Sequence, residues 1–163
     1  MATCEIKGGT RLKGEITPKG AKNEALQILC AVLLTPEKVT SHNIPDILDV
    51  NNLIKLLARL GVEVEKLGEG SYSFMAKEVD FGYMQTEEFR KTASALRGSI
   101  MIVGPLLARF GKGYIPRPGG DKIGRRRLDT HFIGFEMLGA EFDFDVNSNF
   151  YSVTGDKLKG TYM

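Results

Sequence analysis

A short stretch of the chain, residues 114–131, concentrates side chains that could bind an anion or move a proton. It reads Y-I-P-R-P-G-G-D-K-I-G-R-R-R-L-D-T-H and carries a glycine pair at 119–120. Between residues 112 and 127, six cations and one carboxylate give a local charge of +5, against +2 for the whole chain: Lys112, Arg117, Lys122, Arg125, Arg126 and Arg127 with Asp121. Glycines let backbone N–H groups approach a ligand, and arginines bind phosphate oxygens. The stretch predicts an anion site.

Asp121 is the one acidic side chain among these cations, and the residues leave two roles open for it. As a structural residue it would pair with Lys122 or Arg125 and hold the loop together. As a catalyst it would have to keep a proton for delivery to a substrate, against the pull of the neighbouring arginines. The pattern of residues alone favours neither role.

Cations also stand at the starts of two expected buried helices. Lys22 and Asn23 open one of these helices, and Arg97 opens the other. A cation at the positive end of a helix is unfavourable unless an anion offsets it, so both helix starts and the basic loop are expected to converge on a multiply charged ligand. Asp129 is interpreted as an N-cap or as a ligand contact. His131 is interpreted as a half-buried structural histidine, with a role in the site as the alternative.

The elements that must position these side chains are predicted in the same order twice. The first copy is expected to hold a buried helix, a short strand, an amphipathic helix and a hairpin: residues 25–34, 39–44, 50–61, and 62–66 with 71–75. The second copy is expected to repeat them: residues 96–110, 113–115, 128–138, and 141–145 with 150–154. Ahead of both copies, residues 4–6 and 12–16 are expected to form two short strands.

The two copies align by residue type as well as by element. Residues 60–63 (L-G-V-E) match residues 138–141 (L-G-A-E) at an offset of 78, whereas the buried helices match at an offset of 73. The difference of five residues falls in the basic loop of the second copy, and long loops on a rigid scaffold often carry function. Residues 157–161 then echo residues 11–15 as the chain stops, which indicates a fragment of a repeat protein.

Composition narrows the class of protein. Hydrophobic residues make up 42% and charged residues 26% of 163, as in a globular domain. The net charge of +2 gives no reason to expect a nucleic acid or a membrane as partner, and no apolar run approaches the roughly 20 residues of a membrane span. Two isolated cysteines suggest a cytoplasmic setting without a disulfide frame or zinc site. With two histidines, a His-rich metal site is not expected.

Four motifs point to a family: P-K-G-A-K-N-E-A-L at 18–26, L-R-G-S at 96–99, G-P-L-L-A-R-F-G at 104–111 and P-G-G-D-K-I-G-R-R-R-L-D-T-H at 118–131. From about residue 5 to its end, the chain resembles the enolpyruvyl transferases, and among them the branch that acts on UDP-N-acetylglucosamine. The resemblance implies an α/β fold, an inside-out α/β barrel of repeated βαβαββ units. Residues 1–20 would form strands of the other, mostly missing domain. Residues 21–163 would form two of the three units of the substrate-binding domain.

The resemblance also implies a reaction, the transfer of enolpyruvate from phosphoenolpyruvate to the 3-hydroxyl of UDP-N-acetylglucosamine with release of phosphate. This is the first committed step of peptidoglycan synthesis, on which cell shape and division depend. It needs no metal or cofactor, and its partners are the two small-molecule substrates. The implied phosphoenolpyruvate contacts are Lys22 and Asn23. The implied UDP-sugar contacts are Arg97, Arg126, Arg127, Leu128, Asp129 and Thr130.

Asp121 stands where the family usually has its catalytic cysteine, which implies that it protonates C3 of phosphoenolpyruvate. An aspartate offers no thiolate, so resistance to fosfomycin, an epoxide that alkylates that cysteine, is expected. Arg127 stands where the family commonly has proline. The alternatives are the sister 3-phosphoshikimate 1-carboxyvinyltransferase and a non-catalytic module that binds anions or nucleic acid. The isolated 163 residues are expected to be inactive, because the family's cleft closes between two domains.

Overall fold

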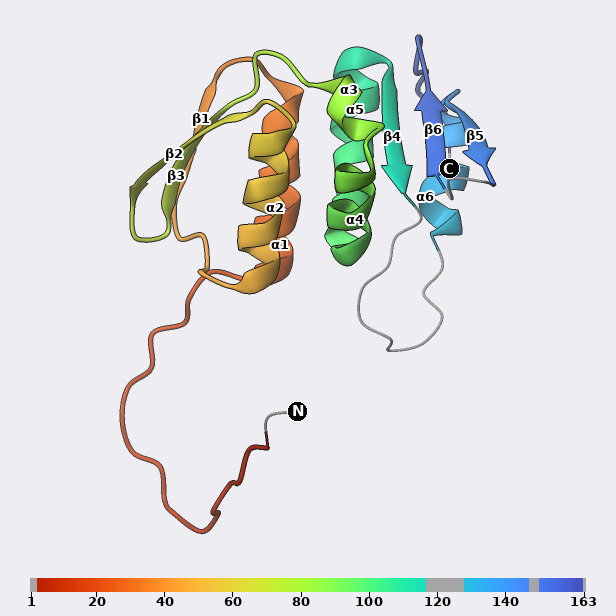
Figure 1. The fold of residues 1–163 in the computed structure, drawn as a ribbon. Coiled ribbons are helices and arrows are strands. Elements are labelled where there is room, and N and C mark those ends of the chain that lie inside the picture. The colour runs from red at the N-terminus through yellow and green to blue at the C-terminus, as the bar shows by residue number, and fades with distance from the viewer. Residues whose placement is uncertain (1–2, 117–127, 147–149, 163) are drawn as a thin grey trace.

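The computed structural model describes residues 3–116, 128–146 and 150–162. Its elements form two groups of the same make-up, separated by two short helices (Figure 1). The first group comprises α1 Lys22–Ala31, η1 Val32–Leu34, β1 Lys38–Ser41, α2 Leu48–Arg59, β2 Glu63–Gly68 and β3 Ser71–Met75. The separating helices are α3 Phe81–Met84 and α4 Glu87–Ala95. The second group comprises η2 Arg97–Ile102, α5 Val103–Phe110, β4 Lys112–Pro116, α6 Asp129–Met137, β5 Glu141–Asp145 and β6 Phe150–Thr154.

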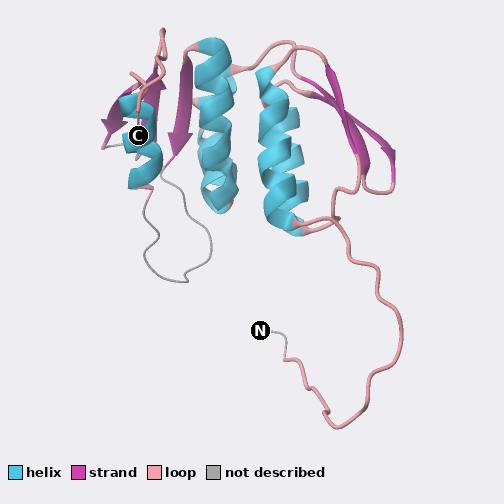
Figure 2. Ribbon diagram, turned by 180° about the vertical axis from the view of Figure 1, so that it is seen from behind, coloured by secondary structure: helices cyan, strands magenta, loops and turns pink. Residues whose placement is uncertain are grey.

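Each group builds a three-stranded antiparallel sheet with its last strand in the middle. The strand orders are β1-β3-β2 and β4-β6-β5. Phe74 of β3 lies opposite Val39 and Val64, as Val153 of β6 lies opposite Gly113 and Phe142. Seen from behind, helices fill the space between the two sheets (Figure 2). The predicted repeat is therefore confirmed in topology and in register, and the fold is α/β as expected.

The amphipathic helix of each copy ends in the same way. Gly61 follows α2 and Gly139 follows α6, and both have φ +96°, a conformation that L side chains rarely adopt. The N–H of Val62 donates to the carbonyl of Leu57 at 3.1 Å, and the N–H of Ala140 donates to that of Phe135 at 2.9 Å. These bonds satisfy carbonyls left free at the helix end. The matching L-G-V-E and L-G-A-E segments thus form the same type of turn in the two copies.

The buried helical segments of the two copies run side by side in the same direction. α1 contacts η2, and η1 contacts α5. The segments approach closely at Gly98, where an added Cβ would lie 3.2 Å from Leu26 Cδ1. The expected helix over 96–110 begins as 3₁₀ structure from Arg97 to Ile102 and becomes α-helical at Val103, with Pro105 in the first turn of α5, where its missing N–H is tolerated. Because α1 pairs with η2 and η1 pairs with α5, the two segments start at the same end of the molecule.

Apolar side chains from both segments and from α2 fill the space between the sheets. Those that are largest and fully buried include Leu29, Leu33, Leu53, Leu57, Ile102 and Leu106, and Phe74 of β3 and Phe89 of α4 join them. Burying one such side chain contributes about 1.5–3 kcal/mol. A second cluster, formed by α5, α6 and the second sheet, includes Val103, Ile115 and Val153. The core therefore fixes the relative positions of α1 and η2.

Arg109 joins the two copies at the opposite end of these paired segments. Its Nη1 donates to the carbonyl of Leu33 at 3.1 Å and to that of Ala76 at 2.6 Å, and its Nη2 donates to that of Lys77 at 3.0 Å. A guanidinium supplies several donors in a rigid plane, so one side chain can satisfy carbonyls from two chain segments. Arg109 links α5 to the end of η1 and to the residues that follow β3.

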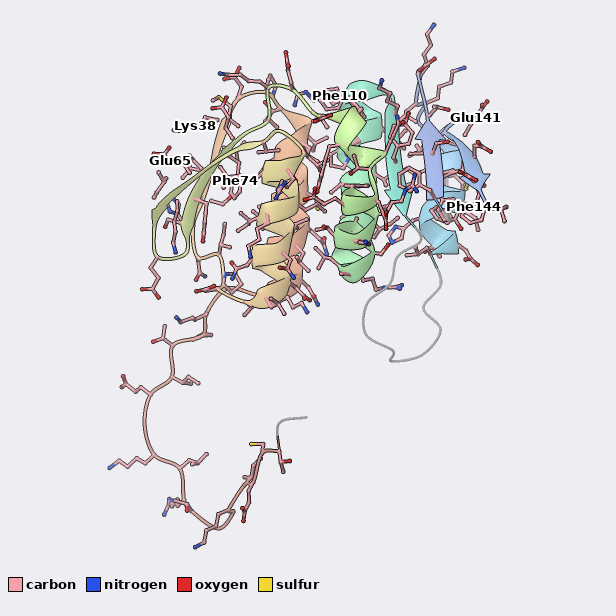
Figure 3. All side chains as sticks on the ribbon, viewed as in Figure 1. Lys38, Glu65, Phe74, Phe110, Glu141 and Phe144 are labelled. Atoms are coloured by element: carbon pink, nitrogen blue, oxygen red, sulfur yellow. The ribbon has the colours of Figure 1, made fainter. Side chains whose placement is uncertain are left out.

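The outer face of the first sheet is charged. Figure 3 shows Lys38 and Glu65 on this sheet, together with Phe74, which belongs to the buried core. Lys38 Nζ lies 3.2 Å from Glu65 Oε2, and the Ser73 hydroxyl donates to the same oxygen at 3.2 Å. Lys38 lowers the pKa of Glu65, mainly through this hydrogen bond and secondly through its positive charge. This face is solvated in the described chain.

Two expectations need correction, and two helices were missed. Residues 4–6 and 12–16 form no strands; residues 3–19 are an exposed coil that extends away from the folded part (Figure 1). A lone two-stranded hairpin is marginally stable in water, and the described part of the chain supplies no layer that would cover the apolar side chains of these residues. The strand expected over 39–44 ends at Ser41, because Asn43 adopts φ +57° and turns the chain. The helices α3 and α4 were not predicted at all.

Candidate functional site

The starts of α1 and η2 line one cleft of about 350 Å³. Lys22 and Asn23 are the first two residues of α1, and Arg97 is the first residue of η2. Their backbones are placed by the parallel packing of the two segments and by the close contact of Leu26 with Gly98. The structure therefore brings these three predicted residues together, although they lie about 75 positions apart in the sequence.

Asp49 is a cleft residue that the sequence analysis missed. It is the second residue of α2 and forms an ion pair with Lys22 through its Oδ2. The two side chains are 38% and 48% exposed, so the pair is partly screened by water. The sequence carried a weak signal for it, a lone acid in the first turn of a helix. Only the packing of α1 against α2 shows that this acid meets Lys22.

The cleft is suited to a small anion with more than one charge. Helix starts present N–H groups without partners in the helix and a partial positive charge. Neither α1 nor η2 has a side-chain cap at its start. The described lining residues carry two cations and one carboxylate, and the amides of Asn23 and Gln27 add neutral donors. A phosphate or carboxylate could accept from the cations and from backbone N–H groups together.

The start of α6 carries other predicted residues, which do not line this cleft among the described residues. Leu128 is the N-cap and Asp129 the first helical residue, so the interpretation of Asp129 as N-cap is wrong. Thr130 and His131 are exposed. The interpretation of His131 as half-buried is wrong too, because His131 is exposed, whereas Leu53, its aligned position in α2, is fully buried.

The basic loop itself lies outside the described residues. Asp121, Arg126 and Arg127 belong to it, together with the glycine pair at 119–120. Its two ends are placed, since β4 ends at Pro116 and Leu128 precedes α6. The binding roles of these residues, and those of Lys22, Asn23 and Arg97, stay predictions from the sequence.

Other reactive groups in the described part of the chain lie away from the cleft. Burial raises the pKa of the Cys30 thiol to about 12, so it does not supply a thiolate near neutral pH.

No group of three or more His, Cys, Asp or Glu side chains that could hold a metal occurs among the described residues. No single described helix is long and apolar enough to cross a membrane; Glu87–Ala95 with Arg97–Phe110 reach that length together, across a bend of 112°.

Comparison with known proteins places the chain in a family. A family profile described as EPSP synthase (3-phosphoshikimate 1-carboxyvinyltransferase) matches residues 6–163. The chain belongs to the EPSP synthase family. Over all 163 residues it is 59% identical to a UDP-N-acetylglucosamine 1-carboxyvinyltransferase of Bacteroides thetaiotaomicron and 53% identical to one of Porphyromonas gingivalis. It spans 38% of the length of each of these relatives.

Solved structures show the same fold. The enolpyruvyl transferase NikO from Streptomyces tendae matches 93% of this chain and 32% of its own, with a TM-score of 0.70 at 18% identity. An EPSP synthase from Acinetobacter baumannii matches 91% of this chain and 33% of its own, with a TM-score of 0.53 at 14% identity. The expected enolpyruvyl transferase fold is confirmed. Each repeat of this EPSP synthase family member shows the order helix, strand, helix, strand, strand.

Proposed function

We propose that the protein of which this chain is a part transfers enolpyruvate from phosphoenolpyruvate to the 3-hydroxyl of UDP-N-acetylglucosamine and releases phosphate. The observation that carries this proposal is the cleft in which Lys22, Asn23 and Arg97 meet at the starts of two parallel helical segments. Phosphoenolpyruvate is a small anion with a phosphate and a carboxylate, which is the ligand chemistry that this cleft suits. The reaction belongs to peptidoglycan synthesis in the cytoplasm.

The acceptor is inferred from the relatives. The family profile is described by a phosphoshikimate reaction, whereas the relatives at 59% and 53% identity over the whole chain are named for UDP-N-acetylglucosamine. We therefore assign UDP-N-acetylglucosamine as acceptor, with the segment from Arg126 to Thr130 and Arg97 as its contacts. Residues 21–163 would supply two repeat units of the domain that binds both substrates. Residues 3–20, with Ile6, Leu12 and Ile16 exposed, would pack on a part of the protein outside this chain.

The chemistry assigns a different task to each group. Asp121, as an acid, delivers a proton to C3 of phosphoenolpyruvate while the acceptor oxygen bonds to C2 and its own proton passes to water. The resulting tetrahedral adduct then returns a proton from C3 to the Asp121 carboxylate and releases phosphate from C2, which restores both the double bond and the acid. Lys22 holds anionic oxygens of phosphoenolpyruvate through both steps and stabilises the charge on the departing phosphate, while Arg97 holds an anionic oxygen of the acceptor.

Phosphate release tests the reaction and the choice of acceptor. In a chimera, residues 1–163 replace the aligned segment of the Bacteroides thetaiotaomicron relative, which supplies the remaining chain. We expect phosphate release with UDP-N-acetylglucosamine and none with shikimate 3-phosphate, and Lys22→Ala should lower kcat/KM by about 100-fold or more. Turnover with shikimate 3-phosphate alone would assign the sister reaction. Turnover with neither acceptor, in a folded chimera, would leave an anion-binding module.

A second test addresses Asp121. We propose that the chimera resists fosfomycin, because an aspartate gives the epoxide no thiolate to alkylate. Asp121→Cys should restore rapid inactivation, with an adduct of fosfomycin on that cysteine in the mass spectrum. Asp121→Asn should lower kcat by about 100- to 10,000-fold, the usual effect of losing a general acid. Near-normal turnover of Asp121→Asn, or rapid inactivation of the unmodified chimera, would remove Asp121 from the acid role.

A further inference from the structure

The ion pair between Lys22 and Asp49 occupies the position where an anion would meet Lys22. Both residues line the cleft, and Asp49 Oδ2 contacts Lys22 Nζ directly. Arg97 lines the same cleft from η2. A ligand anion that approaches Lys22 therefore meets an ammonium that already has a carboxylate partner.

Asp49 is held more firmly than Lys22 by the local structure. Its backbone lies in the first turn of α2, next to the fully buried Val50, so the phase of the helix fixes its direction. A carboxylate in the first turn is also stabilised by the positive end of the helix. Lys22, by contrast, carries its charge on a flexible four-carbon chain. The rigid member of the pair can set the position of the flexible one.

We propose that Asp49 is a positioning residue that holds the Lys22 ammonium over the cleft. An ammonium has three donors and the Oδ2 of Asp49 takes one of them, so an entering anion can bind the other two. This inference rests on the proposed function, since it assigns to Lys22 the anion that the reaction consumes.

The arrangement has opposite effects on binding and on catalysis. Asp49 repels an entering anion and competes with it for Lys22, so its presence weakens anion binding. It also keeps the ammonium in one place, and misplacement of a positioned group by about 1 Å can cost about 100-fold in rate. Loss of the carboxylate should therefore tighten binding and slow turnover, a combination that simple loss of structure does not produce.

Asp49→Asn separates these effects. In the chimera described above, we expect this variant to lower KM for phosphoenolpyruvate and to lower kcat by about 10- to 100-fold. In the 163-residue chain, inorganic phosphate titrated by calorimetry should bind several-fold more tightly to the variant, within the roughly fivefold range of a partly exposed ion pair. The thermal midpoint should stay close to that of the unmodified chain.

A matched control and a double-mutant cycle identify the route. Asp46→Asn removes an equal charge near the start of the same helix, but Asp46 does not line the cleft. Its Oδ1 accepts a hydrogen bond from Asn51 Nδ2 at 2.7 Å. Asp46→Asn should leave phosphate affinity and kcat nearly unchanged. In a Lys22→Ala background, Asp49→Asn should tighten phosphate binding less than it does with Lys22 present, because the competition for Lys22 is lost and only the direct repulsion by Asp49 is left.

Each outcome is decisive. If Asp49→Asn tightens phosphate binding equally with and without Lys22, or changes neither kcat nor KM, Asp49 does not position Lys22 and the proposed function stands. If the unmodified chimera turns over neither acceptor while the cycle still couples Lys22 to Asp49, the proposed function fails and the positioning role holds for an anion site. If phosphate binds no variant and Asp49→Asn raises KM, the inference is overturned.

Discussion

The helices α2 and α6 occupy the same place in the two copies, yet they differ in how well they are covered. Both precede a hairpin and both end at a glycine with φ +96°. α2 buries four side chains, whereas α6 has no buried residue. α1 and α4 both pack against α2, whereas within the described chain α6 packs against β5. The amphipathic helix of the first copy is therefore covered on more sides than that of the second.

The sequence of α6 is that of a helix with more than one covered face. Phe132 and Phe135 pack on the second sheet, while Ile133 and Met137 are 53% and 44% exposed. Apolar residues all round a helix are typical of burial on several sides. The chain spans 38% of the length of the Bacteroides thetaiotaomicron relative, and we propose that a part of the protein outside these residues packs on the exposed side of α6.

The largest expected difference between the copies is the cost of truncating their equivalent core residues, Leu57 of α2 and Phe135 of α6. Leu57 is fully buried, so Leu57→Ala should lower the free energy of unfolding by about 3 kcal/mol. Phe135 is half-buried, and Phe135→Ala should cost about half as much in this chain. Urea unfolding followed by circular dichroism measures both.

Leu48→Ala is the matched control for this comparison, because Leu48 starts the same helix as Leu57 and is 74% exposed. Its unfolding free energy should change by less than about 0.5 kcal/mol. Equal losses of unfolding free energy for Leu57→Ala and Phe135→Ala would show that α6 is covered to the same extent as α2, contrary to the difference in burial. A larger loss for Phe135→Ala in the chimera than in the 163-residue chain would show that a part of the protein outside these residues covers α6.

The parts of the fold that were predicted correctly are those set by local patterns. The stripe of Val50, Leu53 and Leu57 recurs at helical spacing, and the two hairpins alternate around turn residues, so each element could be read where it stands. The match of residues 60–63 with 138–141 gave the repeat. Residues 4–6 and 12–16 have a strand pattern too, but a strand also needs a partner layer, which the described chain does not provide.

The candidate site was predicted in part for the same reason. Lys22 and Arg97 could be singled out because a cation at a helix start is locally unfavourable. Asp49 in the first turn of a helix is locally favourable, so it gave no such signal. Its contact with Lys22, and the three carbonyls that Arg109 reaches, depend on which helices pack together. Long-range packing of this kind cannot be derived from the spacing of residues along one chain.

The smallest effect concerns the feature that the copies share most closely. Gly61→Ala and Gly139→Ala both force a side chain into a left-handed conformation and should each lower the unfolding free energy by about 1–2 kcal/mol. Gly61→Ala should cost slightly more, because its Cβ would lie 3.3 Å from the Glu78 carbonyl oxygen, against 3.7 Å from that of Lys157 at Gly139. Gly134→Ala is the control, since Gly134 lies within α6 and an added Cβ meets nothing within 4 Å; it should raise stability by about 0.5–1 kcal/mol. If Gly139→Ala raises stability as Gly134→Ala does, the second copy does not need the turn that ends the first, and the likeness between the copies stops at their strands.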